Sequence, residues 1–72
     1  MIREGVLFFD RESGRYDAVF EDGSYYDGLH CGEPFDVWLD GKWHSTRIEY
    51  SSKTWYLIGL SDIRLDGRKI RI

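Results

Sequence analysis

Residues 35–49 have the sequence FDVWLDGKWHSTRIE, and this stretch decides the fold. Its apolar residues Phe35, Val37 and Leu39 occupy every second position, which is the pattern of a β-strand with one buried face. The dipeptide Asp40-Gly41 follows at once, and Asp-Gly favours the type I′ turn that joins two strands through two residues. We therefore predict a β-hairpin with strands at 35–39 and 42–49.

The two-residue turn also sets which residues of the hairpin face each other. The predicted cross-strand pairs are Leu39 with Lys42, Trp38 with Trp43, Val37 with His44, Asp36 with Ser45, and Phe35 with Thr46. The Trp38–Trp43 pair falls at a non-hydrogen-bonded position, where an aromatic pair adds up to about 1 kcal/mol over alanines. Because Asp36, Ser45 and Arg47 share that face, we expect the two indoles to be partly exposed.

Similar turn signals recur along the whole chain of 72 residues. They are the dipeptides Ser13-Gly14, Asp22-Gly23, Asp27-Gly28, Asp40-Gly41 and Asp66-Gly67. The segments between them are short and rich in aromatic and β-branched residues, without the spacing of a three-turn helix. The pattern predicts an all-β chain with strands near 3–9, 15–20, 35–39, 42–49, 54–60 and 69–72.

The expected fold is a single small antiparallel barrel spanning residues 1–72. Five or six short strands indicate an SH3-like barrel, with an OB-like barrel as the second choice, because closure removes the exposed edges of a short sheet. A chain of this size buries only about 60% of the surface that it exposes when unfolded, so the core should be thin.

The composition excludes disorder and a membrane segment. Hydrophobic residues make up 42% of the chain and charged residues 32%, which is typical of a folded domain. No apolar stretch approaches the roughly 20 residues that span a bilayer, and the N-terminus has no signal-peptide pattern. Because Cys31 is the single cysteine and cannot form an internal disulfide, we expect a reduced, cytoplasmic protein.

Charge is distributed unevenly along the sequence. The net charge of −3 argues against a general nucleic-acid binder, whose footprint is usually basic. Residues 1–40 carry three basic and ten acidic residues, a net of −7, whereas residues 41–72 carry seven and three, a net of +4. This asymmetry indicates either two charged surfaces or strands that interleave so that opposite charges become neighbours.

Several short runs carry a resemblance to a known family. They are Gly28-Leu29-His30-Cys31-Gly32-Glu33, Phe35-Asp36-Val37, Gly41-Lys42-Trp43, Thr46-Arg47-Ile48-Glu49, Trp55-Tyr56-Leu57, Leu65-Asp66-Gly67 and Ile70-Arg71-Ile72. Together they look like a family of small uncharacterised proteins of Gram-positive bacteria, their phages and integrative elements, known as a domain of unknown function. The Gly-Leu-His-Cys-Gly run is the most specific part. The resemblance implies an accessory protein of a mobile element and brings no reaction with it.

The sequence contains no catalytic or metal-binding motif, so we expect a non-enzymatic protein without a cofactor or metal. His30 and Cys31 are adjacent, and neighbouring side chains of an extended segment point to opposite faces, so neither readily activates the other. A structural zinc site needs four ligands, and only His44 could join these two. We predict that Cys31 is a small buried residue and that His44 lies in or beside the core.

Aromatic residues are more numerous than a thin core needs, with three Trp, five Tyr and four Phe. We expect Tyr16, Phe20, Phe35 and Trp55 to belong to the core. The leading hypothesis is a protein-binding module anchored by Trp38 and Trp43, with Tyr25, Tyr26 and Arg47 at the rim, because interface energy concentrates in Trp, Tyr and Arg.

Two alternatives stay open from the sequence. One is binding of single-stranded nucleic acid by the basic residues Arg64, Arg68, Lys69 and Arg71 with aromatic stacking. The other is a phage-type inhibitor that presents Asp17, Glu21, Asp22, Asp27 and Glu33 to a basic groove of a host nuclease or defence protein. The protein could act as a monomer or as a homodimer, since a symmetric interface would cover an exposed tryptophan pair.

Overall fold

The computed structural model describes residues 2–60 and 62–72, and these residues form β-strands, turns and loops. The six strands are β1 (Glu4–Asp10), β2 (Arg15–Phe20), β3 (Pro34–Leu39), β4 (Lys42–Ser51), β5 (Thr54–Leu57) and β6 (Lys69–Arg71). The prediction of an all-β chain is confirmed. The described part of the chain contains no helix that is long and apolar enough to cross a membrane.

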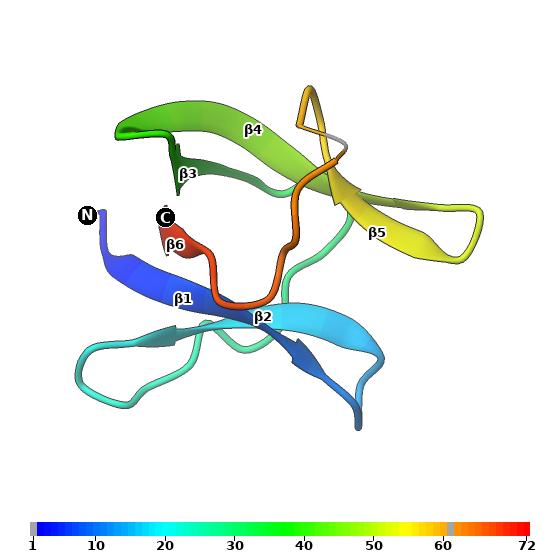
Figure 1. The fold of residues 1–72 in the computed structure, drawn as a ribbon. Coiled ribbons are helices and arrows are strands. Elements are labelled where there is room, and N and C mark those ends of the chain that lie inside the picture. The colour runs from blue at the N-terminus through cyan, green and yellow to red at the C-terminus, as the bar shows by residue number, and fades with distance from the viewer. Residues whose placement is uncertain (1, 61) are drawn as a thin grey trace.

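All six strands join one antiparallel sheet in the order β2-β1-β6-β3-β4-β5. The last strand, β6, lies between the N-terminal hairpin β1–β2 and the hairpin β3–β4, as Figure 1 shows. The two halves of the sequence, which carry opposite net charges, therefore become neighbours in the sheet.

The sheet is barrel-like but not closed, and the segment 24–33 crosses the gap between its ends. The first part of the segment follows the edge of β2, where Tyr26 N donates to Ala18 O at 2.9 Å and Leu29 N to Tyr16 O at 2.8 Å. Its last part follows β4, where Gly32 N donates to Ile48 O at 2.7 Å. One continuous stretch of backbone thus covers the edge of β2 and then extends β3.

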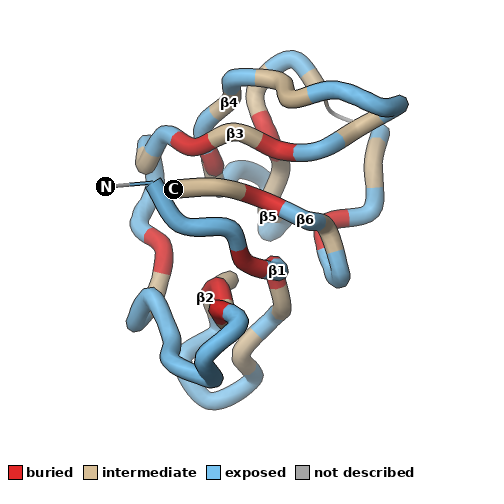
Figure 2. The backbone as a smooth tube through the Cα atoms, turned by 90° about the vertical axis from the view of Figure 1, so that its left-hand side faces the viewer, coloured by how far each residue is buried: buried red, intermediate tan, exposed pale blue. Residues whose placement is uncertain are grey.

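The core lies on the concave side of the sheet. Along the strands, buried stretches alternate with exposed ones, as Figure 2 shows in red and pale blue. The buried apolar residues are Leu7, Ala18, Phe20, Leu29, Phe35, Val37, Ile48, Leu57, Leu65 and Ile70. The prediction that Phe20 and Phe35 belong to the core is confirmed, and Tyr16 and Trp55 pack against it half-buried.

The central hairpin has the predicted turn and register. Asp40 and Gly41 both adopt positive φ, of 53° and 80°, as a type I′ turn requires. All the cross-strand pairs predicted for β3 and β4 are present. The rings of Trp38 and Trp43 meet edge to face, with centroids 5.1 Å apart. His44 is half-buried and its Nε2 lies 3.1 Å from Leu39 O, as expected for a histidine beside the core.

The prediction of a buried Cys31 is wrong, because the side chain is exposed. Cys31 and Gly32 form a tight turn that Glu33 N closes by donating to His30 O at 3.0 Å. The neighbouring Leu29 fills the core in its place, since it is completely buried. The specific Gly-Leu-His-Cys-Gly run is therefore a turn anchored by one leucine.

Candidate protein-binding face

The convex side of the sheet presents side chains that the core does not use. Alternation along the strands places on this side Glu4, Val6 and Phe8 of β1, Val19 of β2, Lys69 and Arg71 of β6, Asp36 and Trp38 of β3, and Trp43, Ser45 and Arg47 of β4. We call this side of the sheet the outer face. No helix or strand of the described chain packs over it.

One row of side chains crosses the outer face from β2 to β4. Val19 faces Val6, Val6 faces Lys69, and Trp38 faces Trp43. Lys69 joins the two halves of the row, because its Nζ lies 5.4 Å from the ring centroid of Trp38 and 5.8 Å from that of Trp43. The row is therefore apolar and aromatic along its length, with one cation near its centre.

A second, charged row runs beside the first. Arg71 Nε donates to Asp36 Oδ2 at 2.8 Å, and its Cζ lies 4.5 Å from the ring centroid of Trp43. The hydrogen bond from Arg71 holds the pKa of Asp36 below its usual value. Lys69 Nζ lies 3.4 Å from Glu4 Oε1. Lys69 and Arg71, the two cations beside the tryptophans, are thus both paired with carboxylates.

The two rows leave apolar surface in contact with solvent. Trp38 is 38% exposed and Val6 is 41% exposed, while Trp43 is half-buried. The partial exposure expected for the tryptophan pair is therefore present. Beside the pair of valines lies a shallow groove of about 430 Å³, lined by Glu4, Gly5, Val6, Val19, Phe20, Glu21 and Lys69.

The three predicted rim residues do not gather around the tryptophan pair. Arg47 lies on the same side of β4 as Trp43 and pairs with Glu49 at 2.9 Å. Tyr25 lies at the far end of the outer face, where its ring meets Phe8 with centroids 5.7 Å apart. Tyr26 donates a hydrogen bond to Glu33, which raises the pKa of the tyrosine.

The four basic residues of the nucleic-acid alternative are divided between two places. Lys69 and Arg71 lie on the outer face beside the indoles. Arg64 and Arg68 belong to the turn before β6, where Arg68 Nε donates to Arg64 O at 2.7 Å. The chain therefore offers no single stripe of these four cations.

The acidic set proposed for an inhibitor is also not one surface. Asp17 is only 8% exposed, so the prediction that it is presented to a partner is wrong. Glu33 accepts hydrogen bonds from Tyr26 and from His30 N. Asp22 Oδ1 accepts a hydrogen bond from Ser24 Oγ and lies 3.6 Å from Arg3 NH2. The hydrogen bonds from Ser24 are the main reason that the pKa of Asp22 is lowered.

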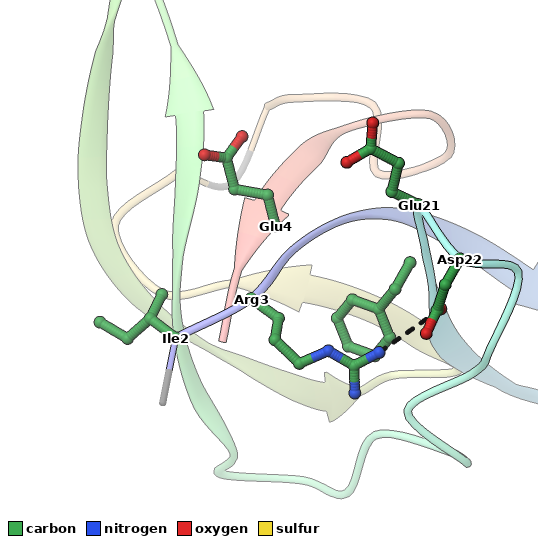
Figure 3. A pocket seen from close by; sticks show the side chains of 6 residues that line it. Ile2, Arg3, Glu4, Glu21 and Asp22 are labelled. Carbon is green, nitrogen blue, oxygen red and sulfur yellow. Dashed lines mark ion pairs between the residues drawn. The ribbon is translucent and has the colours of Figure 1, made fainter.

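Carboxylates lie on two opposite sides of the pocket beside Asp22. Figure 3 shows Arg3 turned toward Asp22, while Glu4 and Glu21 point to the opposite side. The Arg3 Cζ atom lies 3.8 Å from the centroid of Phe20. Glu21 is exposed and lines the groove of the outer face, so it is accessible from that side.

Sequence reasoning missed Val6, Phe8 and Val19 as parts of the outer face. Their alternation with buried residues is visible in the sequence, but their position next to Lys69 and the tryptophans depends on β6 entering the sheet beside β1. Within residues 2–60 and 62–72, no group of three or more His, Cys, Asp or Glu residues is placed to hold a metal ion.

Comparisons with known proteins agree on the fold and give no activity. A family model described as a domain of unknown function, DUF5348, matches residues 5–72. A crystal structure of a protein from Ruminococcus gnavus, a structural genomics target, is 53% identical with a TM-score of 0.89. That match covers 97% of this chain and 100% of the other. No curated protein matches the chain significantly.

Proposed function

The chain belongs to the DUF5348 family of unknown function, and we propose that it is a non-enzymatic module that binds another protein through its outer face. The observation that carries the proposal is the row of Trp38, Trp43, Lys69 and Val6 on an uncovered side of the sheet. A few residues supply most of the binding energy of a protein interface, and tryptophan, tyrosine and arginine are enriched among them.

The charges beside the tryptophans favour a protein partner over a nucleic acid. A nucleic-acid site gains affinity when unpaired cations replace the counterions of phosphate groups. Lys69 and Arg71 are already paired with Glu4 and Asp36, so a phosphate would have to compete with these carboxylates. An apolar partner surface can instead pack on the indoles without breaking either pair.

The location and origin that we propose follow from the sequence. An exposed thiol such as Cys31 suits a reducing compartment, so we propose that the module acts in the cytoplasm. The resemblance to proteins of phages and integrative elements supports an accessory role on a mobile element. A small domain that binds one host protein suits such a role.

The proposal is tested by affinity capture with purified, tagged protein and the cytosol of a Gram-positive host, with and without nuclease. We expect a protein that wild type retains after nuclease treatment and that the Trp38→Ser variant loses. Nucleic acid that nuclease removes, together with loss of all captured protein, would contradict the proposal and favour the basic residues as the site.

The matched control is Tyr50→Ser. Tyr50 is 47% exposed and also belongs to β4, but alternation places it on the other side of the sheet, against Trp55. Both variants are first checked for the far-ultraviolet spectrum and thermal unfolding of wild type. Equal capture by wild type, Trp38→Ser and Tyr50→Ser would contradict the outer face as the binding site.

A further inference from the structure

One half of β4 has a neighbouring strand on only one side. β3 pairs with residues 42–47 of β4, and β5 pairs with residues 48–51 on the other side. Figure 1 shows β5 beside the half of β4 that is far from the β3–β4 turn. β5 ends at Leu57, and the chain turns away at Gly59, which has φ of 79°. Residues 42–45 therefore have no strand of the described chain on the β5 side.

The backbone groups of Trp43 and Ser45 point to this uncovered side. Successive residues of a strand direct their N–H and C=O groups to opposite sides. Arg47 uses the β5 side, because its carbonyl oxygen accepts from Ile58 N at 3.1 Å. Trp43 and Ser45 lie four and two residues before Arg47 and so face the same side, where no described residue hydrogen-bonds to their backbone. We call their outward N–H and C=O groups the open edge of β4.

The open edge differs from the edge of β2, which the chain covers with its own backbone. There the segment 24–33 donates to β2 through Tyr26 N and Leu29 N. An uncovered edge presents donors and acceptors at the repeat of a strand, and an extended chain can pair with them as one more strand. Nucleic acids lack this alternation of N–H and C=O groups. The open edge therefore favours an extended polypeptide.

The side chains along the open edge favour a particular composition of that polypeptide. Residues 42–47 have the sequence KWHSTR, with two basic residues and no carboxylate. Alternation places Trp43 and Ser45 on the outer face, and Lys42 and His44 on the opposite side. Lys42 is exposed and forms no ion pair within 4.0 Å among the described residues. A segment that alternates apolar and acidic residues would place apolar side chains beside Trp43 and carboxylates beside Lys42.

We propose that the open edge of β4 binds an extended segment of a partner protein, in which apolar and acidic residues alternate. The inference rests on the proposed function and names the form of the partner. The segment exchanges backbone hydrogen bonds with Trp43 and Ser45 and becomes an additional strand of the sheet. Its apolar side chains continue the apolar row of the outer face beyond β4.

The test uses the full chain, labelled with nitrogen-15, and a blocked hexapeptide of alternating valine and glutamate. We expect the largest amide chemical shift changes at Trp43 and Ser45, and slower hydrogen exchange of these two amides when the peptide is bound, because both become donors in the new pairing. The corresponding peptide of valine and lysine should bind about fivefold more weakly, because it brings cations to Lys42. Unchanged amides at the open edge, or equal binding of the two peptides, would overturn the proposal.

Two substitutions of Ser45 separate its backbone from its side chain. Ser45→Pro removes the outward N–H but no hydrogen bond between β3 and β4, because Ser45 faces Asp36 at a non-hydrogen-bonded position. Ser45→Ala keeps the N–H and loses the same hydroxyl, which donates to Asp36. We expect Ser45→Pro to weaken binding of the glutamate peptide about tenfold and Ser45→Ala to leave it unchanged. Equal binding by the two variants would contradict backbone pairing.

A charge variant tests the acidic part of the inference without altering the backbone. Lys42→Gln should weaken binding of the glutamate peptide by about two- to fivefold. The matched control is Lys53→Gln, which removes the same charge from an exposed lysine in the turn between β4 and β5 and should change nothing. Equal weakening by both variants would reduce the effect to net charge and overturn the preference for an acidic segment.

The inference and the proposed function fail in distinguishable ways. If capture of a protein from cytosol is lost in Trp38→Ser but kept in Ser45→Pro, the partner packs on the outer face without pairing with β4, and only the inference is overturned. If the glutamate peptide pairs with the open edge but neither Trp38→Ser nor Ser45→Pro changes capture, the outer face is refuted as the protein-binding site.

Discussion

At the scale of single residues, Asp17 shows how a carboxylate organises a loop. Its position in β2 faces outward, yet the segment 24–28 folds over it and its Oδ1 accepts three amide hydrogen bonds. Two of these donors, Asp27 and Gly28, adopt positive φ of 88° and 97°. The sequence alone did not reveal this role, because those donors follow Asp17 by ten and eleven residues.

Replacing Asp17 tests this role directly. We expect Asp17→Ala to lower the free energy of unfolding by about 2–4 kcal/mol, because hydrogen bonds to a charged acceptor are lost and amides are left without a partner. Urea unfolding followed by tryptophan fluorescence measures the change. The exposed control Asp62→Ala should stay within about 0.5 kcal/mol of wild type. A loss for Asp17→Ala as small as the control's would contradict the role.

The Asp36–Arg71 pair gives a prediction for pH. The pKa of Asp36 is lowered in the folded state, so the pair stabilises the fold above the unfolded value of about 3.8. This contribution is lost as the pH falls through the lower folded-state pKa. We expect Arg71→Gln to raise the pKa of Asp36 in a carbon-13 titration of its carboxyl group. Arg64→Gln removes the same charge at a residue outside the pair and should leave the pKa of Asp36 unchanged. An unchanged Asp36 pKa in Arg71→Gln would exclude the ion pair as the cause of the lowered pKa.

At the scale of elements, the hairpins β3–β4 and β4–β5 differ in how clearly the sequence predicts them. The turn at Asp40-Gly41 contains residues that tolerate positive φ. The turn between β4 and β5 uses Ser52 and Lys53 at φ of 53° and 65°, and neither is a typical residue for it. Packing between the adjoining strands compensates for these turn residues, since the ring centroids of Tyr50 and Trp55 lie 4.9 Å apart. Propensity alone therefore did not predict this turn.

The residues of the two turns differ in how well they tolerate positive φ, and this difference predicts a stabilising change. We expect Ser52→Asn combined with Lys53→Gly to raise the free energy of unfolding by about 0.5–1 kcal/mol, because both new residues tolerate left-handed backbone. Gly41→Ala should act in the opposite direction, since Gly41 has φ of 80°. Thermal unfolding measures both. A double variant less stable than wild type would show that the present turn is not strained.

At the scale of the whole molecule, strand order decides what the sequence could and could not predict. Alternation and turn residues were enough for the strands and for the register of Trp38 with Trp43. They could not show that β6 lies between β1 and β3, which places Lys69 and Arg71 beside the indoles and leaves Arg64 in a turn. The candidate site depends on that long-range pairing, so sequence reasoning found only its tryptophan half.

The open sheet leads to the last prediction, which concerns the contact between its two ends. Trp55 of β5 donates from Nε1 to Gly14 O, at 3.2 Å, in the turn between β1 and β2. We expect Trp55→Phe to keep most of the packing but to lower the free energy of unfolding by about 0.5–1.5 kcal/mol. Amide hydrogen exchange should become faster in β5 while β1 and β6 stay protected, because the free end of the sheet opens locally.

The Tyr50→Phe variant is the control for this contact, since it changes the neighbouring aromatic residue without touching the Gly14 hydrogen bond. Faster exchange in all strands alike would mean that the two ends open only with global unfolding. The outer face extends over β2, β1, β6, β3 and β4, and its tryptophan pair lies on β3 and β4, outside this contact. Trp55→Phe should therefore loosen β5 and leave partner capture through Trp38 unchanged, which separates the stability of the open barrel from the surface that it presents.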